Sequence, residues 1–351
     1  MVKFDLGPER FRPSATCPGY SMRINKAATK IVVFIGTTSG TDFKAGGTGF
    51  LVHFDGFIYL VTAKHVATAL PDAPIALRFN NIREGTSFIH LDPLNGWKWY
   101  FHEDDTVDAA VLPISHDLDK FDHLFYPENK IDYRAFPQDQ FMDDNKIAEG
   151  PVGFGDMCYT VGFFRLLVGN KKNLPVVHSG SIARIAGDEL IPVRDWDDPT
   201  RRDRKMISAY LVEQQSLQGL SGSPVFVRLP IMFNSVSTDL GVRDIVVSEY
   251  KVMLLGLWQG SWDAKADEVL AMDKGREMRV PVGMGVVVPC QKIKDVLEDH
   301  ELKAKRDEAR RYLESEGLAK PDSLVGETEA DTEKGDELLR RMLNTPPKPR
   351  R

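Results

Sequence analysis

The chain has 351 residues, of which 42% are apolar, and a formal net charge of −6. This length has room for two domains or one large one, and the apolar fraction is sufficient for a substantial core. The negative net charge gives no support to nucleic-acid binding. No apolar run approaches the roughly eighteen residues that span a bilayer, and the first residues carry no apolar signal segment. We therefore expect neither a nucleic acid nor a membrane as a partner.

Three widely separated cysteines, Cys17, Cys158 and Cys290, fit neither a disulfide framework nor a metal-binding cluster. We expect isolated reduced thiols, with Cys158 in a buried strand. Reduced thiols indicate a reducing compartment, so the sequence predicts a cytoplasmic protein. The sequence has no glycine-rich phosphate loop and no His, Cys or Asp cluster with metal-ligand spacing, so we expect no cofactor and no metal.

Short runs of branched and aromatic residues, separated by Gly, Asp, Asn and Pro, predict β-strands. The first half has six such runs, at Lys30–Ile35, Thr48–Phe54, Phe57–Thr62, Ile75–Phe79, Trp97–His102 and Ala109–Ile114. The second half also has six, at Met157–Gly162, Val176–Ile185, Ile207–Glu213, Ser223–Val227, Met253–Trp258 and Gly285–Val288. Two sets of six predict an all-β fold with two six-stranded antiparallel barrels.

These runs also suggest the domain boundaries. We expect an irregular leader at residues 1–24, a first barrel at 25–115, and a polar connection at 116–150. The second barrel and a C-terminal helix would occupy 151–300. The helix is predicted by apolar residues at i, i+3 and i+4 spacing, at Ile293, Val296 and Leu297.

Residues 301–351 hold equal numbers of basic and acidic side chains and a single aromatic residue. Such a segment cannot bury enough surface to fold alone, so we expect a charged tail that is helical or flexible. A small apolar stripe within residues 338–343 fits either a weakly ordered amphipathic turn or a docking helix for a protein partner.

The segment Gly219-Leu220-Ser221-Gly222-Ser223-Pro224 carries the strongest chemical signal. Its glycines allow a tight turn that exposes the Ser221 hydroxyl and lets backbone N–H groups face an incoming carbonyl. Serine is a poor nucleophile near neutral pH and needs a base within hydrogen-bond reach. His65, just after a predicted strand, is the candidate base. Asp108 directly precedes a buried run and therefore needs a partner, so it is the candidate that orients His65.

The three segments resemble those of trypsin-like serine proteases. Thr62-Ala63-Lys64-His65 matches the family's T-A-x-H, Asp108 to Leu112 matches D-x-A followed by two hydrophobic residues, and Gly219 to Pro224 matches G-x-S-G-x-P. The resemblance runs from about residue 27 to residue 300. Because the disulfides of many secreted members are missing, the chain is most similar to a disulfide-free, bacterial-type member.

The resemblance implies a chymotrypsin-like fold and a serine endopeptidase that forms an acyl-enzyme through His65, Asp108 and Ser221. The backbone N–H groups of Gly219 and Ser221 would form the oxyanion hole. Many members activated by proteolysis have an aspartate where this chain has Leu220. Leucine cannot pair with a newly cut N-terminus, so we expect no zymogen step of that kind.

Substrate specificity is also implied by the resemblance. Gln215, six residues before Ser221, falls at the base of the S1 pocket, where members selective for Arg or Lys have an acid. We therefore expect a neutral P1 residue in a protein or peptide substrate. Four further residues are expected to line the pocket, with Gly285 leaving it open: Gln259, Gly260, Ser261 and Gly285.

Two other functions remain open from the residues alone. One is a catalytically silent protease fold kept as a scaffold or binding module, with the C-terminal tail as its interaction arm. The other is esterase activity from the same site, since ester cleavage is chemically easier than amide cleavage.

Overall fold

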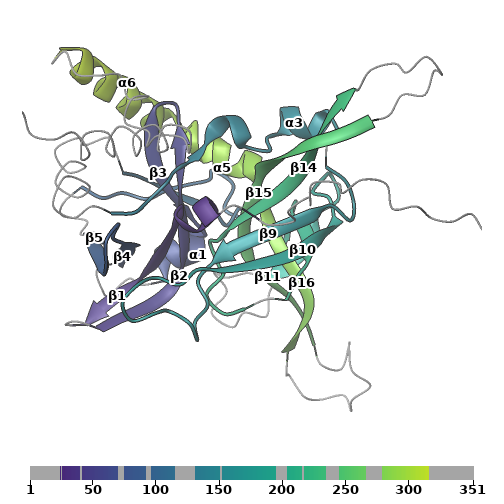
Figure 1. The fold of residues 1–351 in the computed structure, drawn as a ribbon, viewed down its shortest axis with the longest axis horizontal. Coiled ribbons are helices and arrows are strands. Elements are labelled where there is room, and N and C mark those ends of the chain that lie inside the picture. The colour runs from purple at the N-terminus through teal and green to yellow at the C-terminus, as the bar shows by residue number, and fades with distance from the viewer. Residues whose placement is uncertain are drawn as a thin grey trace, which may run out of the picture.

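The structure is a computed structural model. It describes residues 24, 26–39, 42–69, 75–91, 96–114, 131–150, 152–194, 204–215, 217–234, 245–265 and 279–315. The predicted leader before residue 24, the predicted connection up to residue 130 and the tail after residue 315, including its apolar stripe, lie outside the described residues. Figure 1 shows the strands in two groups, with the helices of the C-terminal part running across both.

The N-terminal half is an eight-stranded sheet in the order β5-β4-β1-β2-β3-β7-β6, with β8 paired to β2. All of its pairings are antiparallel except the parallel pair of β2 and β8. The strands are β1 (Val32–Ser39), β2 (Asp42–Phe54), β3 (Phe57–Thr62), β4 (Ile75–Asn80), β5 (Thr86–Leu91), β6 (Tyr100–Phe101), β7 (Ala110–Pro113) and β8 (Phe136–Pro137).

A two-residue turn joins β2 to β3 and sets the register of this sheet. Asp55 and Gly56 have φ angles of 51° and 87°, respectively. Positive φ at both central residues is the type I′ turn, whose twist matches that of the flanking strands. The register then places Thr62, at the end of β3, opposite Ala110, at the start of β7. The two ends carry the chain segments in which His65 and Asp108 lie.

The C-terminal half is a closed six-stranded barrel in the order β10-β13-β16-β15-β14-β9. A separate two-stranded ribbon pairs β11 with β12. The strands are β9 (Met157–Gly162), β10 (Val176–Arg184), β11 (Ile191–Arg194), β12 (Arg204–Ile207), β13 (Tyr210–Glu213), β14 (Pro224–Asn234), β15 (Ile245–Lys265) and β16 (Arg279–Pro289).

The mostly β fold, a closed six-stranded second barrel and a C-terminal helix confirm part of the sequence prediction. The prediction of six strands in the first half is not confirmed, because the sheet has eight and no pairing among the described residues closes it. Two strands account for the difference. Only two of the six residues of β5 are buried, and β8 is two residues long. Neither has the clear alternation on which a sequence prediction depends.

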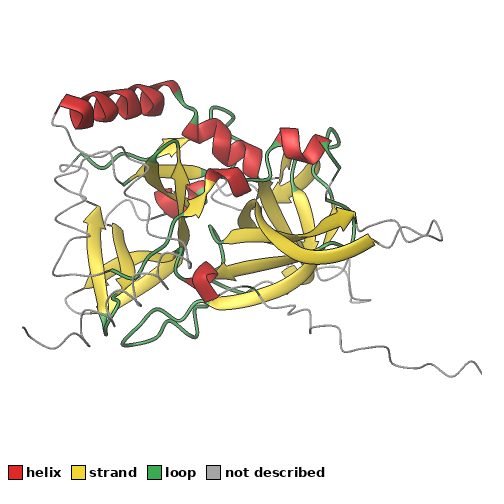
Figure 2. Cartoon of the chain, turned by 45° about the horizontal axis from the view of Figure 1, so that its top comes forward, coloured by secondary structure: helices red, strands yellow, loops and turns green. Residues whose placement is uncertain are grey.

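The helices are short except near the C-terminus. They comprise α1 (Lys64–Thr68), α3 (Asp144–Ala148), α5 (Cys290–Leu297) and α6 (His300–Ser315), with 3₁₀ turns η1 (Lys26–Thr29) and η3 (Gln138–Gln140). α5 contacts β15 and β16 of the barrel and also β7 of the sheet, so it packs against both halves. Figure 2 shows α5 and α6 along one side of the molecule. Among the described residues, no helix is both long and apolar enough to cross a bilayer.

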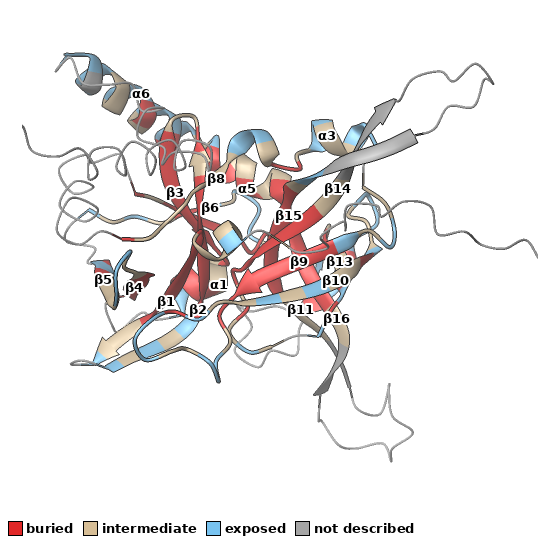
Figure 3. Ribbon diagram, viewed as in Figure 1, coloured by how far each residue is buried: buried red, intermediate tan, exposed pale blue. Residues whose placement is uncertain are grey.

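One hydrophobic cluster is shared by the two halves. Phe34 and Phe50 of the sheet belong to the same buried cluster as Phe226 and Leu254 of the barrel and Ile293 of α5. The buried residues in Figure 3 are concentrated on the strands where the two groups meet. A second buried cluster, which includes Trp258, lies inside the barrel. The shared cluster holds the two halves in a fixed relation to each other, which the candidate site requires.

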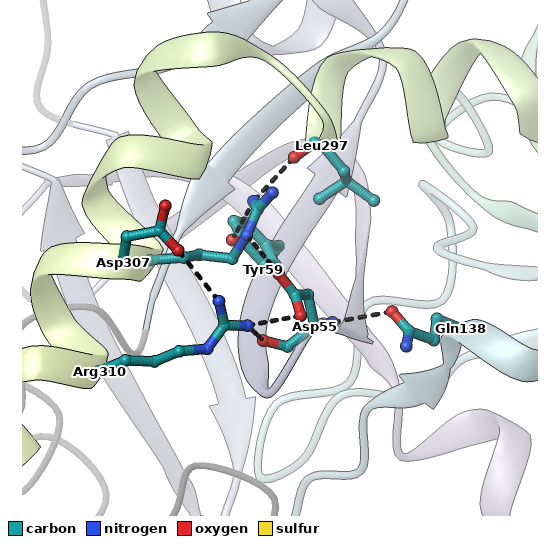
Figure 4. Close-up of polar contacts among 7 residues, drawn as sticks. Asp55, Tyr59, Gln138, Leu297, Asp307 and Arg310 are labelled. Carbon is teal, nitrogen blue, oxygen red and sulfur yellow. Dashed lines mark hydrogen bonds and ion pairs between the residues drawn. The ribbon is translucent and has the colours of Figure 1, made fainter. Parts of the chain in front are cut away.

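A buried arginine attaches α6 to the β2–β3 turn, and Figure 4 shows the neighbouring Arg310 pointing at Asp55 of this turn. Arg306 is 2% exposed and donates to the Tyr59 hydroxyl (2.9 Å), to the Leu297 carbonyl (2.8 Å) and to Asp55 (3.0 Å). Arg310 also pairs with Asp55. Burial acts to raise the pKa of Asp55, but the two guanidinium groups outweigh it and hold that pKa below its ordinary value. Through these bonds α6 stays attached to the sheet although its sequence is mostly charged.

Candidate active site

His65 and Asp108 lie in contact at adjacent strand ends. His65 stands in α1, directly after β3, and Asp108 stands just before β7, which pairs with β3. The His65 Nδ1 atom is 2.6 Å from Asp108 Oδ2, and the His65 backbone N–H donates to Asp108 Oδ1 at 2.9 Å. Asp108 is 7% exposed. Both carboxylate oxygens therefore bind the same residue, which fixes the orientation of the imidazole ring.

This contact decides which ring nitrogen of His65 can act as a base. An ionised carboxylate only accepts hydrogen bonds, so it requires a proton on Nδ1. In the neutral imidazole the Nε2 atom then carries the lone pair. A histidine held in this way can take a proton on Nε2, and the buried carboxylate stabilises the positive charge that results.

The neighbouring carboxylates have different surroundings. The Asp105 side chain is 88% exposed and pairs with Lys64. Asp104 accepts hydrogen bonds from the backbone and side chain of Thr106. These bonds lower the pKa of Asp104 below its ordinary value. Of the three aspartates in this stretch, Asp108 is the one in contact with His65.

The Ser221 segment is a turn that depends on two glycines. Gly219 and Gly222 have φ angles of 104° and 84°, which side chains with a Cβ rarely adopt. A Cβ at Gly219 would collide with the Phe163 ring, and one at Gly222 would collide with the Thr48 carbonyl and the Thr62 hydroxyl. The turn therefore needs glycine at both positions, for conformation and for space.

The Ser221 turn is bound to the β-sheet that carries His65. The Thr48 N–H donates to the Ser221 carbonyl at 3.0 Å, and the Thr48 hydroxyl donates to the Gly219 carbonyl at 2.8 Å. A Cβ at Gly222 would lie 3.1 Å from the Ala63 nitrogen, two residues before His65. The structure thus brings the segments of His65 and Ser221 side by side, across the junction of the two halves.

The side-chain hydroxyl of Ser221, unlike its carbonyl, faces the second barrel. This hydroxyl donates to the Gln259 carbonyl at 3.2 Å. Among the described residues, neither the Gly219 N–H nor the Ser221 N–H donates a hydrogen bond to another protein group. Two such N–H groups next to a serine hydroxyl are available to a ligand oxygen that carries negative charge.

The residues expected to line a specificity pocket lie on, or just after, three neighbouring strands. Gln259, Gly260 and Ser261 belong to β15, and Ser261 is paired with Gly285 of β16. Gln215 follows β13, which pairs with β16 on its other side. Gln215 is exposed, whereas Gln259 is 4% exposed. The five residues therefore share one side of the barrel, although they are far apart in the sequence.

The expectation that Gly285 leaves open space is wrong. A Cβ at Gly285 would collide with the indole of Trp258, which is 1% exposed. The glycine accommodates a large aromatic ring of the protein itself, and the space next to it is already filled. A sequence shows that a glycine has no side chain, but not which neighbouring side chain occupies the room.

Three residues of this region were not predicted from the sequence. Thr48 is fully buried and binds both Gly219 and the Phe163 N–H. Phe163 packs under Gly219 and against Phe34 with ring centroids 5.0 Å apart. Gln214 is 4% exposed and accepts from Thr160 at 2.7 Å. No local pattern marks these residues, because each acts through a partner that is distant in the sequence.

No protein-family model matches the chain, and no curated protein matches it. Solved structures of the Rv3671c protease from M. tuberculosis are similar to it. The active form has 16% sequence identity and a TM-score of 0.38, with 77% of this chain and 81% of that chain covered. The inactive form has the same identity and TM-score, with 77% and 89% covered. At this identity and TM-score the likeness carries no statement about the activity of this chain.

Proposed function

We propose that the protein is a serine endopeptidase that acts through His65, Asp108 and Ser221. The observation that carries this proposal is the contact of both Asp108 oxygens with His65, at 2.6 Å and 2.9 Å. That contact calls for a proton on Nδ1, so in the neutral ring Nε2 carries the lone pair that a base needs. A histidine oriented by a buried carboxylate, in a segment that lies next to a serine on a glycine turn, is suited to nucleophilic catalysis.

The proposed reaction proceeds in two halves. Ser221 rotates its hydroxyl away from the Gln259 carbonyl, His65 takes the proton, and Oγ attacks the carbonyl carbon of the peptide bond. The N–H groups of Gly219 and Ser221 bind the resulting oxyanion. The imidazolium gives its proton to the leaving amine as the C–N bond breaks, which leaves an ester on Ser221. Water, deprotonated by His65, then hydrolyses this ester and restores the serine.

Activation and specificity belong to the same proposal. Leu220 is fully buried in the barrel cluster, which supports a turn held by apolar packing and not by an ion pair with a cut N-terminus. The enzyme is thus active without such a cut. A neutral P1 residue follows from Gln215, which carries no charge. A peptide library scanned at P1 tests this, and a strong preference for Arg or Lys contradicts it.

A cytoplasmic location is proposed from the thiols. Cys158 and Cys290 are both free and buried. Burial raises the pKa of the Cys158 thiol to about 12, so this thiol is protonated and unreactive at neutral pH. A structural thiol of this kind needs no oxidising compartment.

Labelling with a fluorophosphonate probe tests the catalytic assignment. We expect covalent labelling of the intact protein at Ser221, located by peptide mass spectrometry, and its complete loss in Ser221→Ala. Ser223→Ala is the matched control, because Ser223 lies two residues away and is fully buried. Hydrolysis of a peptide library, absent in Ser221→Ala, separates endopeptidase from esterase activity. No labelling under any condition would overturn the enzymatic proposal in favour of a scaffold with a protease-like site.

A further inference from the structure

The segment between β9 and β10 connects the candidate site to a distant strand of the N-terminal sheet. It comprises residues 163–175, and a hydrogen bond from the Leu174 N–H to the Val168 carbonyl closes it into a loop. Its first residues contact the turn that carries Gly219, and its far end contacts β4. We call it the bridging loop.

At its far end, the bridging loop is held by a buried arginine that belongs to the sheet. Arg78 of β4 is 4% exposed, and its guanidinium donates to the carbonyls of Gly169 and Asn170, each at 2.9 Å. It also lies 5.5 Å from the centroid of the Phe43 ring and 6.0 Å from that of Phe88. Burial lowers the pKa of Arg78 below its ordinary value.

Arg78 is unusual because no carboxylate among the described residues pairs with it, and its buried Nε atom has no partner there. A buried charge without a counter-ion is costly, whereas an apolar residue at this position of β4 would not carry that desolvation cost. The cost is consistent with a role in holding the bridging loop, since the loop carbonyls are the polar groups that satisfy the guanidinium.

A second contact strengthens this attachment. The Asn173 N–H donates to the Asn80 side-chain oxygen at 2.6 Å, and the Asn80 amide donates to the Asn173 carbonyl at 3.2 Å. The Asn173 side chain in turn donates to the backbone carbonyl of Arg78 at 2.7 Å. The loop is therefore held on β4 by side chains of both partners and not by a β-ladder.

At its near end, the bridging loop binds the backbone of the Ser221 turn. The Arg165 N–H donates to the Gln218 carbonyl at 2.9 Å. The Arg165 guanidinium is 3.3 Å from the Gln218 side-chain oxygen. Phe163, the first residue of the loop, packs under Gly219. The loop thus contacts the peptide unit from which the Gly219 N–H projects.

This hydrogen bond sets the direction of the Gly219 N–H. In a planar trans peptide the C=O and the following N–H point in opposite directions. Because the Gln218 carbonyl points at the bridging loop, the Gly219 N–H must point away from it. If the bond to Arg165 is lost, this peptide unit is free to rotate, since glycine tolerates most φ values.

We propose that Arg78 is a positioning residue for the oxyanion-binding N–H of Gly219, acting through the bridging loop. This inference rests on the proposed function, in which that N–H stabilises the transition state. Arg78 touches neither Ser221 nor the substrate. Its role is to hold the loop so that Arg165 keeps the Gln218–Gly219 peptide in the orientation that catalysis needs.

Three variants of the full chain test this role. Arg78→Met keeps the aliphatic length and removes all donors, and Arg78→Lys keeps the charge but cannot bind two carbonyls in a fork. Arg306→Met is the matched control, because Arg306 is equally buried, at 2% exposure, but binds α6 to the β2–β3 turn. All assays are run below the unfolding temperature of the least stable variant.

Steady-state kinetics on a peptide substrate give the first readout. We expect kcat of Arg78→Met to fall about 10- to 100-fold with KM within about twofold of the wild type, because a donor used only in the transition state is misplaced. Affinity for a peptidyl boronate, which forms a tetrahedral anionic adduct, should fall by a similar factor. The kcat of Arg78→Lys should lie between those of the wild type and Arg78→Met. Arg306→Met should keep the wild-type kcat. Equal kcat in Arg78→Met and Arg306→Met would overturn the inference.

Hydrogen exchange gives a readout that does not depend on activity. In Arg78→Met the amides of residues 163–168 should exchange faster by about tenfold or more, because the Arg165 N–H loses its acceptor when the loop detaches. In Arg306→Met they should exchange at the wild-type rate. If the wild type hydrolyses nothing, the proposed function fails while this measurement still tests the attachment. Unchanged exchange in Arg78→Met refutes the role of Arg78 even in an active enzyme.

Discussion

Gly222 and Gly155 share a φ angle of 84° but differ in their surroundings. A Cβ at Gly155 meets nothing within 4 Å, whereas one at Gly222 collides with Thr48 and Thr62. We expect Gly155→Ala to cost about 1 kcal/mol of unfolding free energy, from the left-handed conformation alone. Gly222→Ala should cost about 3 kcal/mol or more and abolish fluorophosphonate labelling, because the Ser221 turn is displaced. Urea denaturation measures both values. Equal costs would show that close packing does not hold the turn.

Asp108 and Asp105 lie three residues apart in the sequence, but of these two only Asp108 touches the imidazole of His65. Asp108→Asn should lower kcat by about 10⁴-fold, because an amide can donate to Nδ1 and so favours the wrong tautomer of His65. Asp105→Asn removes a largely exposed charge and should leave kcat within about twofold, as expected of a surface ion pair. Single-turnover acylation of an ester substrate measures both effects. Similar losses in the two variants would contradict the assignment of Asp108.

At the scale of elements, a carboxylate of α6 adds to the attachment that Arg306 and Arg310 provide. Glu301 binds Lys98 at 2.5 Å and the Tyr100 hydroxyl at 2.6 Å. Both bonds lower the pKa of Glu301, from 4.5 to about 2, and the bond from Lys98 has the larger effect. The folded state thus binds the Glu301 proton less tightly than the unfolded state does. Its contribution to stability is present above pH 4.5 and is lost as the pH falls towards 2.

This linkage predicts how the melting temperature depends on pH. The difference in Tm between the wild type and Glu301→Gln should be largest near neutral pH and should shrink as the pH falls below 4.5. Glu308→Gln is the control, because Glu308 is exposed on the same helix and forms no ion pair with another described residue. Differential scanning calorimetry from pH 7 to pH 3 measures all three proteins. A difference that persists unchanged at pH 3 would show that the Glu301 carboxylate does not hold α6.

At the scale of the whole molecule, the shared hydrophobic cluster couples the two halves. Phe226 of the barrel is fully buried in this cluster. The centroid of its ring lies 5.0 Å from that of the Phe136 ring of β8. Separating the halves would expose this cluster to water, which is unfavourable for every apolar side chain in it. The candidate site spans the same junction, since Thr48 of the sheet binds the Ser221 turn.

We therefore expect a single cooperative unfolding transition, with equal calorimetric and van't Hoff enthalpies. Phe226→Ala should lower the unfolding free energy by about 3–5 kcal/mol. It should shift the unfolding midpoint followed by far-UV circular dichroism and the midpoint followed by the fluorescence of Trp99, which directly precedes β6 of the sheet, by the same amount. A barrel substitution that leaves the Trp99 transition unchanged would instead show that the halves unfold independently.

Local patterns were sufficient for much of the fold and for the pairing of two residues of the candidate site. The predicted bounds of β3 and β9 coincide with those observed, because a run of apolar and branched residues bounded by Gly or Asp is a local signal. His65 and Asp108 were paired from sequence context, and the structure places them in contact. The adjacency of Asp108 to a buried run was enough to distinguish it from Asp104 and Asp105.

Only the tertiary structure decided the rest. The sequence does not show that Trp258 fills the space beside Gly285, that β5 and β8 extend the first sheet, or that Arg78 binds the bridging loop. In each case the stabilising contact is made with a partner that is remote along the chain. A sequence pattern reports only the exposure and backbone preference of consecutive residues. The sequence by itself determined which side chains the candidate site contains. The packing of the two halves decided how close they lie.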